Sequence, residues 1–339
     1  MKAIGYTGGK PLDQPDAFVR FECETPVPTG RDILVSVRAV SVNPVDTKVR
    51  SRITEAQDPP RILGWDAAGI VDAVGSEATL FRPGDAVFYA GDITRPGSNA
   101  THQLVDERIV GHQPGSASFA QAAALPLTAI TAWEALFERL KIRPEADAGK
   151  RILIIGGAGG VGSIAVQLAK QVARLEVIAT ASRDETRHWC RSQGADHTVN
   201  HHTDMPAEFR EQGIAAPDYI LCTNGADRHF PAMIELIAPQ GMICTIVEST
   251  KGHDLDALKT RSAGFVWEFM FTRSMFRTPD MIRQHELLNE IARLIDAGKI
   301  VSTLNSIPGS ICPEAVRAAH RTIETGRSIG KIVLEGFGD

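Results

Sequence analysis

The sequence predicts an α/β protein with two domains, one of them built on a parallel sheet. Two observations lead to this prediction. The chain of 339 residues is about twice as long as a typical domain of roughly 150 residues. In addition, short β-branched runs dominate before residue 119, whereas apolar strands alternate with helical segments after it.

The first part of the chain reads as β-rich. Residues 31–42 alternate apolar and polar side chains, as a half-buried strand does. Residues 69–88 contain two β-branched runs separated by a polar turn, and a Pro-Gly-Asp cluster interrupts the second run. No long amphipathic helix is expected before Phe119, where Ser118 is suited to cap a helix.

The middle of the chain alternates between short apolar runs and helical patterns. The expected strands are residues 151–155, 176–180, 219–223 and 241–247. The expected helices are residues 129–140, 163–174, 185–193 and 232–237. This alternation is typical of βαβ units with a parallel sheet. It stops after Thr250, where helical stretches at 279–298 and 313–326 precede a final strand at 330–334.

Composition and charge exclude several classes of protein. Hydrophobic residues make up 43% and charged residues 23%, which excludes a mostly disordered chain. The net charge of −5 argues against nucleic-acid or anionic-membrane binding. The five cysteines are scattered and the N-terminus lacks the apolar run of a signal peptide. We therefore expect a cytoplasmic protein without disulfides or a membrane span.

A glycine loop carries the strongest functional signal. Residues 152–170 run from a buried strand through Gly157, Gly159, Gly160, Val161 and Gly162 into a helix, which satisfies G-x-G-x-x-G. These glycines permit a tight turn, close approach to a pyrophosphate and tight helix–strand packing. The helix N-terminus then faces the phosphates. The context predicts a Rossmann doubly wound sheet, and the alternative is a turn that binds nothing.

The residues after the second strand of this unit bear on the choice of cofactor. Ser182 and Arg183 offer a hydroxyl and a guanidinium, which suit the 2′-phosphate of NADP(H). Asp184 favours NAD instead, because an acid at this place binds the ribose 2′-hydroxyl. Arg183 is alternatively a solvated surface residue. We favour NADP(H).

Motifs along nearly the whole chain resemble those of medium-chain dehydrogenase/reductases. Within that superfamily the chain resembles the quinone oxidoreductase branch and the bacterial group called zinc-type alcohol dehydrogenase-like proteins. The matching segments are residues 41–46, 63–69, 81–85, 123–128, the glycine loop, 267–276 and 330–334. The resemblance implies a GroES-like β-barrel catalytic domain from residues 1–124 and 266–339 and a Rossmann domain from residues 125–265. It also implies an interdomain cleft where nicotinamide meets substrate.

The resemblance raises the question of zinc. Asn43 stands where zinc alcohol dehydrogenases have their first cysteine ligand, and Trp65 stands where they have a histidine. No cysteine lies between Cys23 and Cys190, so the cysteines of a structural zinc lobe are missing. We expect no zinc at either place. His197, His201 and His202 form a cluster that could bind a metal, although a polar loop explains them equally well.

Without zinc, alcohol oxidation lacks the Lewis acid that lowers the pKa of the alcohol. Hydride transfer from NADPH to a quinone or an α,β-unsaturated carbonyl remains feasible, because conjugation activates the acceptor carbon. The alternatives are a zinc-dependent alcohol dehydrogenase and a non-catalytic NADPH-binding sensor or structural protein.

Four residues are candidates for the chemistry. Asn43 is the first candidate donor to a developing oxyanion, or else a residue of an Asn-Pro turn. Lys48 could polarise a carbonyl or donate a proton, or else is an exposed lysine. Trp65 could form an aromatic pocket wall, or else fill the core. Tyr89 follows a strand and could project toward the cleft.

The resemblance and the strand ends imply further contacts with the cofactor. Thr131 matches a residue that contacts the nicotinamide amide, and Lys331 in the last strand belongs to the expected cofactor site. Thr223, Asn224, Ile246 and Val247 end two strands at the edge where ligands bind. The resemblance also implies a homodimer paired through a Rossmann strand edge near residues 241–247.

Overall fold

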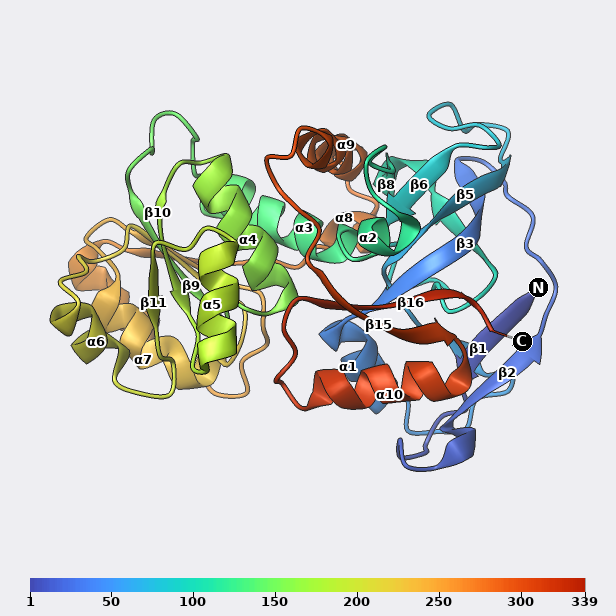
Figure 1. The fold of residues 1–339 in the computed structure, drawn as a ribbon, viewed down its shortest axis with the longest axis horizontal. Coiled ribbons are helices and arrows are strands. Elements are labelled where there is room, and N and C mark those ends of the chain that lie inside the picture. The colour runs from blue at the N-terminus through green and yellow to red at the C-terminus, as the bar shows by residue number, and fades with distance from the viewer. Residues whose placement is uncertain (339) are drawn as a thin grey trace. The chain divides into compact units, whose positions relative to one another are not determined.

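The computed structural model describes residues 1–338 as two compact units (Figure 1). Unit 1 consists of Met1–Leu127 and Phe271–Asp339, and unit 2 consists of Thr128–Met270. The middle of the chain is therefore inserted between the two parts of unit 1. The boundaries expected from the sequence, after residues 124 and 265, precede those at 127 and 270 in the structure.

Unit 1 contains two sheets. The smaller one is antiparallel, with the order β2 (Phe18–Glu22), β1 (Lys2–Tyr6) and β4 (Arg61–Ile62). The larger one has the order β15 (Leu304–Ile311), β16 (Lys331–Phe337), β3 (Asp32–Val42), β5 (Ala67–Val74), β6 (Ala86–Tyr89) and β8 (Val110–His112), and β7 (His102–Asp106) also pairs with β3. Strands from the two ends of the chain therefore share one sheet.

The helices of unit 1 follow local capping signals. Ser118 caps α2 (Phe119–Ala123): its hydroxyl accepts a hydrogen bond from the Gln121 amide at 3.2 Å, and the Gln121 side chain accepts one from the Ser118 amide at 3.0 Å, which confirms the predicted cap. Asn43 precedes α1 (Pro44–Arg52), where Pro44 occupies the first helical position. The remaining α-helices and short 3₁₀ turns are α8 (Thr272–Phe276), α9 (Arg283–Asp296), α10 (Pro313–Glu324), Pro15–Ala17 and Glu107–Ile109.

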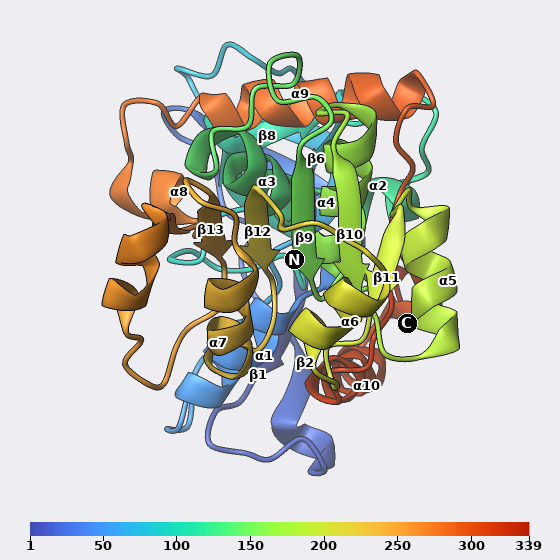
Figure 2. The same cartoon turned by 90° about the vertical axis from the view of Figure 1, so that its left-hand side faces the viewer.

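Unit 2 contains a six-stranded parallel sheet (Figure 2). Its order is β11 (His197–Val199), β10 (Glu176–Thr180), β9 (Arg151–Ile155), β12 (Tyr219–Cys222), β13 (Met242–Thr245) and β14 (Gly264–Trp267). The alternation therefore continues past Thr250, contrary to the prediction, because β14 adds one more strand after the short 3₁₀ helix Leu255–Arg261.

Helices cover both faces of this sheet. The helices α6 (Met205–Glu211) and α7 (Ala226–Leu236) pack on the face that includes Leu153, Ile155 and Ile220. The helices α4 (Gly160–Gln171) and α5 (Asp184–Ser192) lie along the opposite face (Figure 1). The helix α3 (Pro126–Trp133) continues as a π-helix over Glu134–Arg139. None of the described helices is long and apolar enough to cross a membrane.

Candidate functional site

The glycine loop in unit 2 has the geometry that the sequence predicts. A Cβ atom on Gly162 would lie 2.1 Å from the Gly156 carbonyl oxygen, and one on Gly157 would lie 2.7 Å from the Ala179 Cβ. Glycine is therefore required at both positions. A Cβ on Gly159 would meet only the Gly156 oxygen at 3.5 Å, so this stretch of backbone stays open to approach. The first amides of α4, from Gly160 to Gly162, have no acceptor within the helix and suit a phosphate.

The parallel register brings the other predicted cofactor residues to the same edge of the sheet. Ile155 pairs with Cys222, and Cys222 pairs with Thr245, so the loops that follow all three strands begin side by side. The Thr223 hydroxyl donates a hydrogen bond to the Ile155 carbonyl at 2.7 Å, which fixes the loop to the end of β9. Asn224, Ile246 and Val247 follow at this edge, and Thr131 is buried on α3. The strand order reverses between β9 and β12, where doubly wound folds bind ligands.

Basic side chains gather beyond β10 and β11. Thr180 pairs with Val199, so Ser182 and Arg183 follow one strand while His201 and His202 follow its neighbour. The His201 ring lies 4.3 Å from the His202 ring and 6.0 Å from the His229 ring, measured between centroids. Burial, followed by the nearby histidines, Arg228 and Arg183, lowers the pKa of His201 to about 4. The region therefore favours a negatively charged group.

Arg183 itself is engaged with an acid, because its Nε lies 2.7 Å from the Glu185 carboxylate. Two of the three histidines that the sequence groups together are neighbours, but His197 instead lies 3.2 Å from the Glu176 carboxylate. The described residues contain no group of three or more His, Cys, Asp or Glu side chains that could hold a metal ion.

Unit 1 contains a buried polar cluster formed by Asn43, Asp46, Asp66 and Lys331, which we call the Lys331 cluster. The Lys331 ammonium lies 3.0 Å from the Asp66 carboxylate and donates to the Asn43 side-chain oxygen. The Asn43 side-chain amide donates to Asp66 at 3.0 Å, and the Asn43 backbone amide donates to Asp46 at 2.6 Å. Burial raises the pKa of Asp46 to about 7 and also raises that of Asp66.

These contacts bear on three predicted roles. Asn43 uses its side-chain amide hydrogens on Asp66 and on the Ser41 carbonyl, so the geometry does not support the predicted role as an oxyanion donor. Trp65 is fully buried and donates to the Asp92 carbonyl at 3.1 Å, which favours the core-filler alternative over a pocket wall. Lys331 points its ammonium at Asn43 and Asp66, and its predicted contact with the cofactor stays a prediction.

The other two catalytic candidates differ from each other. Lys48 is exposed on α1, consistent with either of its readings. Tyr89 is buried, and within the described chain its hydroxyl has no hydrogen-bond partner. Burial also raises the pKa of Tyr89, which disfavours ionisation. Neither residue belongs to the Lys331 cluster. Asp46 and Asp66 do, and the sequence reasoning did not select them.

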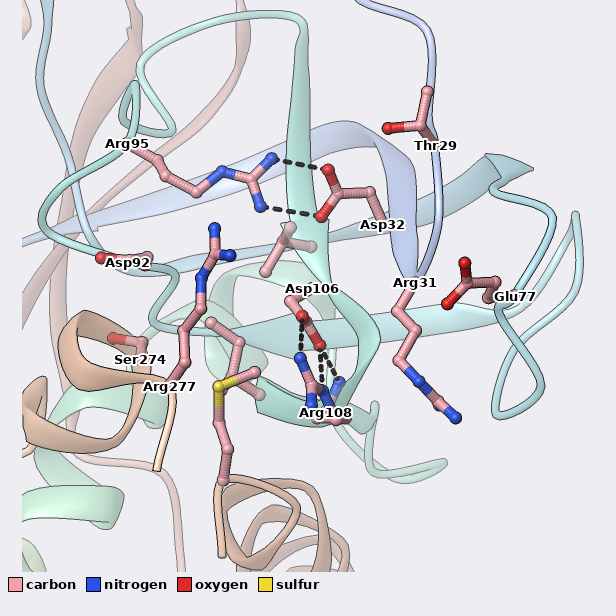
Figure 3. A pocket seen from close by; sticks show the side chains of 13 residues that line it. Thr29, Arg31, Asp32, Glu77, Asp92, Arg95, Asp106, Arg108, Ser274 and Arg277 are labelled. Carbon is pink, nitrogen blue, oxygen red and sulfur yellow. Dashed lines mark hydrogen bonds and ion pairs between the residues drawn. The ribbon is translucent and has the colours of Figure 1, made fainter. Parts of the chain in front are cut away.

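A cavity of about 640 Å³ in unit 1 contains none of the predicted site residues (Figure 3). Arg95 forms two hydrogen bonds with Asp32, at 2.8 and 2.9 Å, and Arg108 pairs with Asp106 at 2.7 and 2.9 Å. Charged side chains of the lining thus largely neutralise one another, and no catalytic arrangement results.

Comparisons with known proteins follow the two-unit architecture. The alcohol dehydrogenase GroES-like domain family matches residues 29–134, and the zinc-binding dehydrogenase family matches residues 193–334. A zinc-type alcohol dehydrogenase-like protein of Staphylococcus aureus (strain Mu50) is 48% identical over 98% of this chain and 99% of its own length. This chain belongs to the medium-chain dehydrogenase/reductase superfamily.

More distant superfamily members are enzymes with printed activities. The 2-methylene-furan-3-one reductase of Solanum lycopersicum is 29% identical over 98% of this chain and 79% of its own length. A crystal structure from Rhizobium etli CFN 42, named as a zinc-dependent alcohol dehydrogenase, is 50% identical, covers 100% of this chain and 99% of that one, and has a TM-score of 0.95. The Escherichia coli quinone oxidoreductase complexed with NADPH shares the fold, with 23% identity, a TM-score of 0.82 and coverage of 99% of this chain and 100% of that one.

Zinc is the metal that the family name implies, and the residues of the Lys331 cluster do not fit it. Asn43 and Trp65 stand at the two ligand positions, where an amide oxygen bonded to an ammonium and a buried indole offer no zinc ligand. The remaining carboxylate, Asp66, is already bonded to Lys331. A dinucleotide fits better, since the glycine loop leaves room for its pyrophosphate.

Proposed function

We propose that this medium-chain dehydrogenase/reductase is a zinc-independent oxidoreductase that transfers hydride from NADPH to a quinone or an α,β-unsaturated carbonyl. The observation that carries the proposal is the Lys331 cluster, which puts an ammonium and an amide where zinc alcohol dehydrogenases hold their metal. The printed activities of the quinone oxidoreductase and the furanone reductase give the substrate class further support.

The protein's part in this reaction is binding and orientation. NADPH, when bound, supplies the hydride. The open backbone at Gly159 and the free first amides of α4 bind the pyrophosphate. Ser182 and the basic surroundings of His201 attract the 2′-phosphate, and the Thr223 loop lies at the edge where the nicotinamide ribose rests.

The choice of acceptor follows from the absence of a Lewis acid in the proposal. An isolated alcohol needs its proton withdrawn, which zinc achieves by lowering the pKa. A quinone or enone needs no such step, because conjugation already makes one carbon electrophilic. The substrate therefore has to be positioned rather than activated, and the physiological compound is set by the shape of its binding site.

Steady-state assays test the proposal. Oxidation of NADPH and of NADH is followed with 9,10-phenanthrenequinone, 1,4-benzoquinone and a simple enone. We expect turnover with NADPH, and we expect Arg183→Ala to raise KM for NADPH while leaving KM for NADH nearly unchanged. Arg187→Ala, on the same helix α5, is the matched control. Stoichiometric zinc that is lost together with activity on chelation refutes the proposal, and NADPH binding without turnover favours a binding protein.

We also propose that the protein is a cytoplasmic homodimer without nucleic-acid or membrane partners. The expected interface near residues 241–247 needs correction, because β13 is paired on both sides, with β12 and β14. The outer edge of the sheet is β14, where Trp267 is 51% exposed. Pairing of two β14 edges supports the dimer, and sedimentation velocity tests it, since a monomer at micromolar concentration contradicts it.

A further inference from the structure

Lys331 is unusual because a single buried ammonium is surrounded by oxygen atoms. Its residue is 3% exposed. The ammonium has three hydrogens and faces three acceptors: the Asp66 carboxylate at 3.0 Å, the Asn43 side-chain oxygen, and the Val42 carbonyl at 3.5 Å. The oxygen atoms are thus arranged around the ammonium as ligands are arranged around a small cation.

The oxygens come from segments far apart in the sequence. Asp66 precedes β5, and its other oxygen accepts the Leu127 backbone amide at 2.9 Å. Asn43 precedes α1, and Lys331 opens β16, where its backbone amide donates to the Thr303 carbonyl at 2.8 Å. One ammonium therefore ties the start of α1, the start of β5 and the start of β16 together.

The charges of the cluster require a cation at this point. Asp66 is fully buried and Asp46 is 1% exposed, and each carboxyl raises the cost of ionising the other. Burial raises the pKa of Asp46 to about 7, so this carboxyl is partly protonated near neutral pH. Without Lys331, the Asp66 carboxylate would be buried with no positive partner, which is strongly unfavourable.

We infer that the Lys331 ammonium is the fixed cation of this centre and takes the place that a metal ion has in zinc-binding relatives. The inference deepens the proposed function and rests on it, since it names what replaces zinc in a zinc-independent enzyme. Lys331 is a positioning residue: it neutralises Asp66 and holds the Asn43 side chain through its oxygen. A divalent ion is excluded because it would meet an ammonium already bonded to the same oxygens.

A double-mutant cycle and metal analysis test the inference together. Purification without a metal-affinity tag, followed by elemental analysis, is expected to show no stoichiometric zinc in the wild type. Its thermal midpoint is expected to be the same with EDTA and with added Zn²⁺. Lys331→Met is expected to lower the midpoint by on the order of 10 °C, because it leaves a buried carboxylate unpaired. Asp66→Asn in the Lys331→Met background is expected to recover a large part of this loss.

Two further variants distinguish a cation from a merely well-packed side chain. In Lys331→Ala, added methylammonium is expected to raise the thermal midpoint, and it is expected to have no effect in Lys331→Ala/Asp66→Asn. Lys2→Ala, an exposed lysine of the same unit, is the matched control for methylammonium. Stoichiometric zinc in the wild type overturns the inference, as does additivity of Lys331→Met and Asp66→Asn.

The readouts separate this inference from the proposed function. Metal content, thermal midpoint and methylammonium rescue are measured without substrate. If the cycle shows coupling and quinones are not reduced, the fixed cation stands and the substrate class is wrong. If quinones are reduced and the two mutations are additive, the enzyme stands and the role of Lys331 is wrong.

Discussion

His320 lies inside unit 1 on α10, and we expect its replacement by leucine to make the protein more resistant to mild acid. The residue is fully buried, and among the described residues neither ring nitrogen has a hydrogen-bond partner. Its ring lies 5.1 Å from that of Phe18, between centroids. Burial, followed by the positive charge of Arg50, lowers the pKa of His320 from 6.5 to about 3.

The sign of the effect follows from this lowered pKa. In the folded protein the ring stays neutral down to about pH 3, whereas in the unfolded chain it takes up a proton below about pH 6.5. The stability that comes from the neutral ring is therefore fully present above pH 6.5 and is lost as the pH falls toward 3. At pH 5 the unfolded chain has gained about 1.5 units of protonation free energy, or about 2 kcal/mol.

Urea unfolding of wild type and His320→Leu between pH 7.5 and pH 5 measures this contribution. The wild type is expected to lose about 2 kcal/mol more unfolding free energy over this range than the variant loses. His188→Leu, an exposed histidine on α5, is the matched control and should follow the wild type. Equal losses in wild type and His320→Leu would refute the reasoning, because the ring would then titrate alike in both states.

Two further predictions concern the cofactor loop and the chemistry. Gly162→Val is expected to weaken NADPH binding by more than about tenfold, because a Cβ at 2.1 Å from the Gly156 oxygen forces the loop to move. Fluorescence titration with NADPH checks this, with Gly252→Ala, where a Cβ meets nothing within 4 Å, as control; unchanged affinity contradicts it. Tyr89→Phe is expected to keep its turnover and to gain up to about 1 kcal/mol of stability, because it removes a buried hydroxyl without a partner among the described residues. A loss of quinone turnover in this variant would instead give Tyr89 its predicted catalytic role.

Much of unit 2 could be predicted because its strands are buried on both faces. Residues 151–155 and 176–180 are unbroken apolar runs, and both match the bounds of β9 and β10 in the structure. The short strands gave no such signal. His197–Val199 has three residues in a polar stretch, and Leu304–Ile311 contains Pro308 and Gly309, which read as a loop and are tolerated at a sheet edge.

The same difference separates the two parts of the candidate site. The glycine loop is local, so its spacing in the sequence carries its geometry. The Lys331 cluster joins Asp66 and Lys331 across 265 positions, and no periodicity or motif links them. The departures at Asn43 and Trp65 indicate that the metal ligands are missing, but only the tertiary structure shows which side chain occupies their surroundings.

The strand β16 has a consequence for how the protein is made. It lies between β15 and β3 in the larger sheet of unit 1, yet it is the last strand to be synthesised. Part of β3, Ala39–Val42, therefore has to wait with an unpaired edge while about three hundred residues are translated. The inserted unit 2 has all its strands by then and is free to fold first. A ribosome-stalled chain that lacks β16 should consequently be open to proteolysis in unit 1 and protected in unit 2.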